Sequence, residues 1–297
     1  MKIIITGAKG QLGNELISIL QNKKSEIGRI DSRLDDVQVV GIDIDDLDIS
    51  DSKCVLDFIL RETPDVVINC AAMTNVNGCE SNLELAFKVN ALGPRNLAIA
   101  CENVGAKLVH ISTDYVFEGN SSKPYIEWDM CNPQNNYGKS KLMGEKYASQ
   151  FCSKSFIVRT SWLYGYIGNN FVKTIIKLAR EKDKIKVVND QRGNPTNAND
   201  LAHHILKIIL TEEFGVYHCT CNGECSWYDF ACEFVALAGI KCDVETCSSD
   251  EFPSPTKRPA YSSLDNLMLR CTVGDEMRNW KDAIKQYIEN AINRGII

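Results

Sequence analysis

Short apolar segments alternate with amphipathic segments along the first half of the chain. Apolar, β-branched runs occupy residues 2–6, 37–43, 66–70, 107–112 and 155–159, and such runs are typical of strands that are buried on both faces of a parallel sheet. Between them, apolar residues recur at helical spacing, and we expect helices from about residue 11, after a cap at Asp51 or Ser52, over 83–103 and over 136–151. This alternation predicts an α/β fold with a Rossmann-type, doubly wound parallel sheet.

The alternation of apolar and amphipathic segments becomes less regular after about residue 160. Helical patterns recur at 169–182, 198–211, 226–239 and 279–293, with short strands and loops between them. We therefore expect a Rossmann domain over residues 1–160 and a smaller, helix-rich C-terminal lobe over 161–297. Some segments of this lobe are expected to return to the first domain.

Composition and charge exclude several classes of protein. Hydrophobic residues make up 44% of the chain and charged residues 24%, which is typical of a globular protein. The net charge of −6 argues against binding to nucleic acid or to anionic membranes. No apolar run reaches the roughly 18 residues of a membrane span, and the first apolar run meets Gly7 too soon for a signal peptide. These features predict a cytoplasmic protein.

The 13 cysteines are scattered and odd in number, so reduced thiols in a reducing compartment are expected rather than disulfides. One tight group lies at 218–225, where His218 is followed by Cys219, Cys221 and Cys225. Zinc sites favour paired Cys-x2-Cys spacings, which this group lacks. We interpret it as a strand end followed by a turn at an Asn-Gly pair, and we expect no resident metal.

A glycine-rich motif follows the first apolar run. Gly7, Gly10 and Gly13 have G-x-x-G-x-x-G spacing between an expected strand and an expected helix. Glycine allows the backbone to approach a pyrophosphate, and the helix N-terminus supplies free N–H groups. The motif predicts dinucleotide binding.

Such a site also needs an acidic residue after the second strand, to hold the adenosine ribose. Asp43 is the candidate, and Asp48 is a second one. The polar stretch 22–36, which we interpret as a surface insertion, explains the long separation from the glycines. The alternative is that these acidic side chains only face water.

Tyr137 and Lys141 are four residues apart within an expected helix, so they lie on one face of it. A tyrosine of pKa ~10 transfers protons poorly near neutral pH unless a cation lowers that value, and Lys141 supplies one. Thr113 ends an expected central strand, at the sheet edge where α/β proteins bind ligands. Tyr-x3-Lys alone occurs by chance in many proteins, but in this context it predicts transfer of a hydride and a proton to or from an oxygen-bearing carbon.

These motifs, together with further segments of the chain, resemble the extended short-chain dehydrogenase/reductases and, within them, the reductases of dTDP-4-dehydrorhamnose. The further segments are 69–74, 112–117, 159–165, 190–196 and 257–259. The resemblance implies reduction of the C4 ketone of dTDP-4-dehydro-β-L-rhamnose to dTDP-β-L-rhamnose, the last step of dTDP-rhamnose biosynthesis, with NADPH or NADH. It leaves a Mg²⁺ requirement and a homodimeric state open.

The resemblance also implies roles for single residues. Tyr137 is the implied proton donor, Lys141 its activator, and Thr113 a partner of the reacting oxygen. Besides Tyr137 and Lys141, the cofactor is expected to contact Gly7, Gly10, Gln11, Leu12, Gly13, Asp43, Asp48, Ile49, Ala71, Ala72, Thr74 and Asn90. The sugar nucleotide is expected to contact Thr113, Asp114, Tyr115, Trp162, Asn170 and Arg258. Met73 and Asn77-Gly78 depart from the family pattern, which often has His and Asp-Lys there.

Two other functions stay open at this stage. A nucleotide-sugar dehydratase or epimerase could have the same fold, but such dehydratases usually carry Asp-Glu where this chain has Asp114-Tyr115. A non-catalytic subunit resembling the regulatory β subunit of methionine adenosyltransferase is the second alternative. Retention of Thr113, Tyr137 and Lys141 together favours an enzyme.

Overall fold

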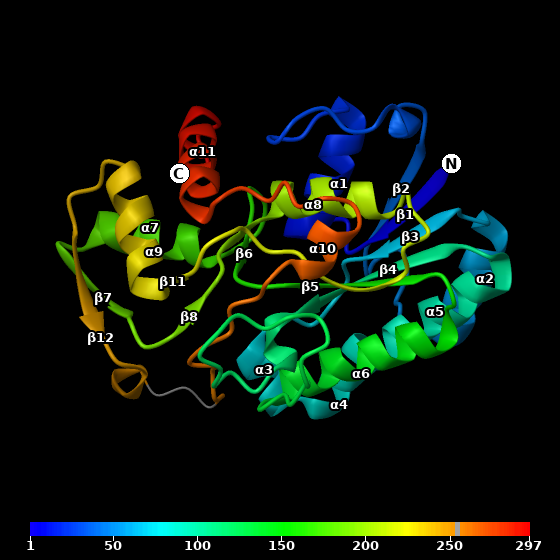
Figure 1. Cartoon of the computed structure of the whole chain (residues 1–297), viewed down its shortest axis with the longest axis horizontal. Helices are drawn as coiled ribbons and strands as arrows, with labels where there is room; N and C mark the ends of the chain where they lie inside the picture. Colours follow the sequence, from blue (N-terminus) through cyan, green and yellow to red (C-terminus); the bar gives the residue numbers. More distant parts are fainter. Residues whose placement is uncertain (253–255) are drawn as a thin grey trace.

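The computed structural model describes residues 1–252 and 256–297. Its centre is a six-stranded parallel sheet with the strand order β10-β5-β4-β3-β1-β2 (Figure 1). The strands are β1 (Lys2–Thr6), β2 (Gln38–Ile42), β3 (Val66–Asn69), β4 (Lys107–Thr113), β5 (Ser155–Thr160) and β10 (Gly215–His218). The five apolar runs of the sequence all form strands of this sheet. Every residue of β3 and β5 is buried, as continuous apolar runs predict.

Helices cover both faces of the sheet, which confirms the predicted Rossmann-type, doubly wound architecture. On one face lie α1 (Gln11–Asn22) and α8 (Ala198–Ile208), and on the other lie α2 (Ser52–Glu62), α5 (Gly93–Val104) and α6 (Asn136–Phe151). Side chains alternate along a strand. Ile3 and Ile5 therefore join the core beneath α1, whereas Ile4 joins the core beneath α2.

The helix expected over 83–103 is interrupted. It consists of α4 (Leu83–Phe87), a π-helical turn η2 (Lys88–Leu92) and α5. Pro94, in the first turn of α5, has no N–H to donate to the carbonyl four residues earlier, and the turn before it widens. A short α3 (Val76–Ser81) precedes α4. The cap expected for α2 is confirmed, because the Asp51 carboxylate accepts hydrogen bonds from the N–H groups of Lys53 and Cys54.

The C-terminal lobe lies beside the sheet, at the left of Figure 1. Its helices are α7 (Phe171–Glu181), α9 (Trp227–Leu237) and α11 (Trp280–Asn293), and α10 (Leu267–Cys271) lies nearer the sheet. Short strands pair as β7 (Lys184–Val188) with β12 (Asp243–Cys247), β6 (Leu163–Tyr164) with β9 (Thr196–Asn197), and β8 (Arg192–Gly193) with β11 (Cys225–Ser226). Three 3-10 turns are η1 (Ser32–Leu34), η3 (Asp114–Val116) and η4 (Ser249–Glu251).

Segments beyond residue 160 also contribute to the central sheet and to the helices that cover it. Strand β10 pairs with β5 at the sheet edge, and α8 packs on α1. Within the described residues, no helix combines the length and apolar character needed to span a membrane.

Most of the segment 22–36 lies at the surface, as the sequence suggested, but parts of it pack into the protein. Ile30 and Leu34 are buried in the core shared with α1 and α8. The carboxylate of Glu26 accepts hydrogen bonds from Arg278 (2.8 Å) and Asn290 (3.0 Å). Through Glu26 the segment therefore connects the central sheet and its helices to α11.

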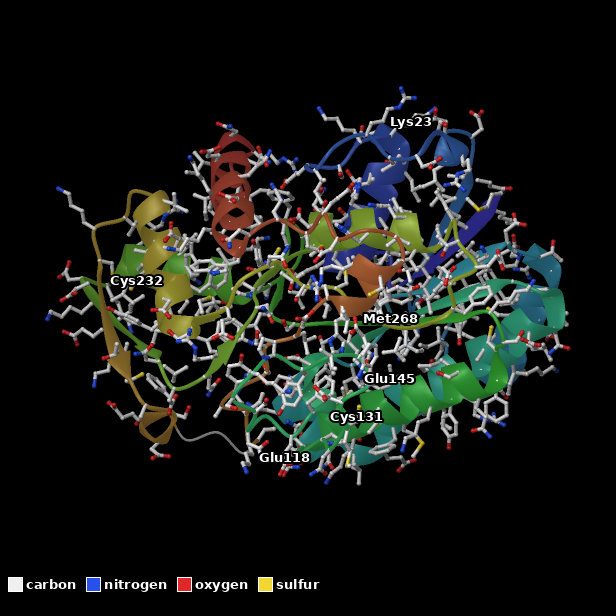
Figure 2. All side chains as sticks on the ribbon, viewed as in Figure 1. Lys23, Glu118, Cys131, Glu145, Cys232 and Met268 are labelled. Atoms are coloured by element: carbon white, nitrogen blue, oxygen red, sulfur yellow. The ribbon has the colours of Figure 1, made fainter. Side chains whose placement is uncertain are left out.

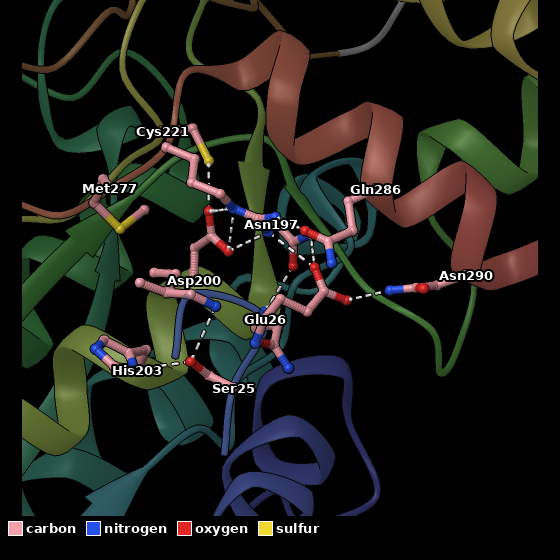
Figure 3. Close-up of polar contacts among 12 residues, drawn as sticks. Ser25, Glu26, Asn197, Asp200, His203, Cys221, Met277, Gln286 and Asn290 are labelled. Carbon is pink, nitrogen blue, oxygen red and sulfur yellow. Dashed lines mark hydrogen bonds and ion pairs between the residues drawn. The ribbon is translucent and has the colours of Figure 1, made fainter. Parts of the chain in front are cut away.

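Arg278, which precedes α11, is the centre of that network. Its guanidinium pairs with Asp200 of α8 (Nε–Oδ2 2.9 Å, Nη2–Oδ1 2.5 Å) as well as with Glu26. The side chain of Asp200 is fully buried, and burial raises the pKa of this carboxyl whereas Arg278 opposes the rise. Figure 3 shows Glu26, Asn290 and two residues at the start of α8, Asn197 and Asp200, converging on this point.

Arg278→Gln should lower the free energy of unfolding by about 3–5 kcal/mol, because removing one partner of a buried ion pair leaves the other charges uncompensated. Urea denaturation measures the change. The matched control is Arg180→Gln on the exposed side of α7, which should change stability by less than about 0.5 kcal/mol. Equal effects of the two substitutions would contradict a clamping role for Arg278.

Candidate active site

A cavity of about 730 Å³ lies at the carboxyl ends of the central strands. Its lining includes Gly7 after β1, Ala71 after β3, Thr113 at the end of β4 and Thr160 at the end of β5. The chain runs outward from β1 to β2 and then returns to β3 on the other side of β1. Open α/β sheets bind ligands at such a reversal of strand order.

The glycine motif forms a cradle at one end of this cavity. Gly7 has a φ of +64°, and a Cβ there would lie 2.8 Å from the backbone nitrogen of Ala71. A Cβ on Gly13 would lie 2.3 Å from the Gly7 carbonyl oxygen. Only glycine permits this close approach of loop, strand and helix. Because no side chain caps α1, its first N–H groups suit the pyrophosphate of a dinucleotide.

The predicted ribose ligand, Asp43, lies beside this cradle. Its carboxylate accepts hydrogen bonds from the backbone N–H groups of Lys9 (2.9 Å) and Ile44 (2.9 Å). The Lys9 ammonium lies 2.7 Å from the carboxylate of Asp45 in an exposed pair. The cavity wall here brings together predicted cofactor residues, namely Gly10, Gln11, Leu12, Asp43, Asp48, Ile49, Ala71, Ala72 and Thr74.

Thr113, Tyr137 and Lys141 line the same cavity. Tyr137 lies in the first turn of α6, which Asn135 caps by accepting a hydrogen bond from the Gly138 N–H. The Thr113 side chain lies close enough to Tyr137 to act against the rise in the pKa of the phenol, and the Thr113 hydroxyl donates to Asp114 (2.9 Å). The Lys141 ammonium donates to the Ile111 carbonyl on β4 (2.5 Å). The three candidate catalytic groups are therefore assembled by one helix and one strand.

Burial governs the protonation of these groups. It raises the pKa of Tyr137, which is opposite to the shift expected from Lys141. Burial lowers the pKa of Lys141 to about 8, against an upward influence from the Glu145 carboxylate. Burial also raises the pKa of Asp114 to about 6. At neutral pH the cavity is accordingly lined by a protonated phenol and an ammonium, and the phenol can donate a proton to a ligand oxygen.

Aromatic residues dominate the other end of the cavity. Tyr115 packs edge-on against Tyr137, with ring centroids 5.6 Å apart, and Trp162 stacks on Trp227 at 3.5 Å. Arg258 does not line this cavity but an adjoining one of about 190 Å³, which shares Tyr115 with it. Arg258 lies close enough to Tyr115 for its charge to act against the rise in the pKa of that phenol.

Two predicted ligand-binding residues have side chains that contact other parts of the protein. The Asn90 amide bonds to both backbone groups of Met73 (2.8 and 3.0 Å) and to Ser140 (3.1 Å). The Asn170 side chain caps α7 and donates to Gln11 (3.0 Å) and to the Gly165 carbonyl. Each amide joins segments that do line the cavity, Asn90 through the loop after β3 and Asn170 through Gln11.

The sequence analysis overlooked a buried ion pair behind the site. Glu145 accepts from Arg159 through two hydrogen bonds (2.9 and 2.8 Å) and from the Ser112 hydroxyl. Arg159 also donates to Cys131 (3.2 Å), and Figure 2 shows Cys131 and Glu145 near each other beside α6. A charged residue at the end of the apolar run 155–159 was the available signal. Trp227, which also lines the cavity, gave none.

The cysteines of the 218–225 group have separate partners. Cys219 contacts Met277 (3.7 Å), and Cys221 contacts Asp200 (3.8 Å). The segment does turn at Gly223, where φ is +84°. Across residues 1–252 and 256–297, no three His, Cys, Asp or Glu side chains are grouped to hold a metal ion.

Comparison with known proteins agrees with this geometry. The family model described as RmlD substrate binding domain matches residues 1–293. A solved dTDP-4-dehydrorhamnose reductase from Clostridium acetobutylicum is 50% identical, with a TM-score of 0.93 over 98% of this chain and 100% of that one. One from Bacillus anthracis, solved in complex with NADP, is 40% identical, with a TM-score of 0.90 over 97% and 99%.

A curated relative from Aggregatibacter actinomycetemcomitans bears the same name. It is 38% identical over 96% of this chain and 97% of its own length. These matches extend over the cradle, the Thr113–Tyr137–Lys141 group and the C-terminal lobe alike. The chain belongs to the dTDP-4-dehydrorhamnose reductase family.

Proposed function

We propose that this chain reduces the C4 ketone of dTDP-4-dehydro-β-L-rhamnose to the alcohol of dTDP-β-L-rhamnose, the last step of dTDP-rhamnose biosynthesis. The observation that carries the proposal is the assembly of Thr113, Tyr137 and Lys141 in one cavity with a dinucleotide cradle. The relatives with this activity in their names support the choice of substrate. When bound, NADPH or NADH supplies the hydride.

The proton comes from Tyr137 in this proposal. As hydride reaches C4, the carbonyl oxygen becomes an alkoxide, which is a stronger base than a phenolate. The raised pKa of Tyr137 keeps its proton in place until that moment, so the transfer is coupled to the reaction. The Thr113 hydroxyl donates a hydrogen bond to the same oxygen, and the Lys141 cation stabilises the phenolate that is left behind.

The aromatic end of the cavity suits the sugar nucleotide. We place the sugar between Tyr115 and Trp162, with Asp114 available to its hydroxyl groups. Arg258, close to Tyr115 at the rim, is placed to bind the diphosphate, since a guanidinium matches phosphate oxygens in a bidentate manner.

The alternatives fit the site less well. A dehydratase needs a second carboxylate beside Asp114, where Tyr115 stands with its pKa raised to about 12 by burial. A regulatory subunit has no need of the assembled proton donor. All cysteines of the described chain are free, which suits a reducing cytoplasm.

The proposal is tested by mixing the protein, NADPH and dTDP-4-dehydrorhamnose. The amount of NADPH oxidised, measured as the loss of absorbance at 340 nm, should equal the amount of dTDP-rhamnose formed. The expected ratio is one cofactor per sugar, because the hydride is not returned to the cofactor. The same mixture without protein is the control. Conversion of the substrate to an isomer or a dehydrated sugar without cofactor loss would indicate a redox-neutral epimerase or dehydratase, and an unchanged substrate would favour a binding module.

Tyr137→Phe should lower kcat by about 10²–10⁴-fold with little change in NADPH affinity, since the lost proton is needed only in the transition state. Stopped-flow turnover and cofactor titration measure the two effects. Tyr147→Phe, a change of the same kind on the outer part of α6, should keep nearly full turnover. Near-normal turnover of Tyr137→Phe would remove Tyr137 from the mechanism.

A further inference from the structure

Trp162 has an unusual backbone conformation for its position at the cavity wall. Its φ is +45°, in the left-handed region that non-glycine residues rarely adopt. Contacts to the neighbouring segment hold it there. The Thr196 N–H donates to the Trp162 carbonyl (3.2 Å), and the Ser161 hydroxyl donates to the Asn194 carbonyl (2.7 Å). The segment 194–196 thus fixes the backbone on both sides of the strained residue.

The indole of Trp162 fits against two further groups. One face lies on the Trp227 ring at 3.5 Å, with only 5° between the ring planes. Its edge lies on Gly193, where a Cβ would come within 2.8 Å of Cε2 and 2.9 Å of Nε1. A side chain at residue 193 would therefore displace the indole, because neither the Trp162 ring nor the Gly193 backbone can shift without a substantial energetic cost.

Trp227 is itself held in place. It begins α9 directly after Ser226, which forms a reciprocal capping box with Asp229. Phe171 packs against it at 4.3 Å. Gly193 and Cys225 are partners in the β8–β11 pair, so the strand under the indole edge is joined to the strand that leads into Trp227. Gly193 and Trp227, the two residues that contact the Trp162 indole, are thus linked to each other through the β8–β11 pair.

We propose that Gly193 and Trp227 are positioning residues that fix the Trp162 indole as a rigid wall of the sugar end of the cavity, and so set the affinity for the sugar nucleotide. This inference rests on the proposed function. A wall that is already ordered loses no side-chain entropy when a ligand binds. It contacts the sugar equally in the ground state and the transition state, so its loss should raise KM more than it lowers kcat.

Gly193→Ala and Trp227→Ala should each raise the KM for the sugar nucleotide and the Kd for dTDP-rhamnose, measured with NADP⁺ present, by about tenfold. We expect kcat to fall by no more than about threefold, and the Kd for NADP⁺ to stay within about twofold. Trp227→Phe, which keeps an aromatic surface, should restore most of the affinity. Gly28→Ala, where a Cβ meets nothing within 4 Å, and Trp128→Phe, at an exposed residue, are the matched controls.

A second readout needs no substrate. Two indoles stacked at 3.5 Å should give an exciton couplet in circular dichroism, which Gly193→Ala, Trp227→Ala and Trp162→Phe weaken and Trp128→Phe leaves intact. An unchanged couplet and Kd in Gly193→Ala would overturn the inference, as would equal losses of NADP⁺ and sugar-nucleotide affinity, which indicate a merely structural role. Failure of the wild-type protein to bind dTDP-rhamnose, with the couplet responding as expected, would instead overturn the proposed function and with it the affinity claim.

Discussion

The ion pair between Glu145 of α6 and Arg159 of β5 determines where the candidate catalytic groups lie. Both residues are only 4% exposed, and two buried charges are tolerated only when each is well paired and hydrogen-bonded. Glu145 lies one helical turn beyond Lys141, and it also binds the hydroxyl of Ser112, which precedes Thr113. The pair therefore fixes α6, with its tyrosine and lysine, against the strand that ends in Thr113.

Buried ion pairs also fix the segments that form the two ends of the cavity. Arg159 is followed by Thr160 at the end of β5, and the chain then turns into the strained Trp162 and the C-terminal lobe. On the other side of the sheet, Arg278 connects α8 and the segment after α1 to α11. A dinucleotide cradle made by the first domain and an aromatic wall made largely by the lobe are thereby held at a fixed separation, as a hydride transfer between two bound molecules requires.

The elements that are determined by neighbouring residues could be predicted from the pattern of apolar residues and glycines in the sequence. Most strands followed from apolar runs because β1, β3, β4 and β5 are buried along most of their length, whereas the edge strand β2 is only partly buried. The cradle followed from glycines whose spacing matches a strand-turn-helix. Contacts between distant segments could not be anticipated, such as Glu26 with Arg278 at a separation of 252 residues or Trp162 with Trp227. The direction of the pKa shift of Tyr137 was also missed, because burial is the largest influence on this phenol and burial is a property of the assembled fold.

The central claim is that this cavity delivers a hydride to C4 of the sugar while Tyr137 supplies the proton. The most direct measurement uses NADPH deuterated at C4 of the nicotinamide, on the face that is transferred, with dTDP-4-dehydrorhamnose as substrate and mass and NMR analysis of the sugar product. The account predicts one deuterium per product molecule, located at C4 of the rhamnose. A product that carries hydrogen from water at C4, or a sugar that leaves the cavity unreduced, would contradict it.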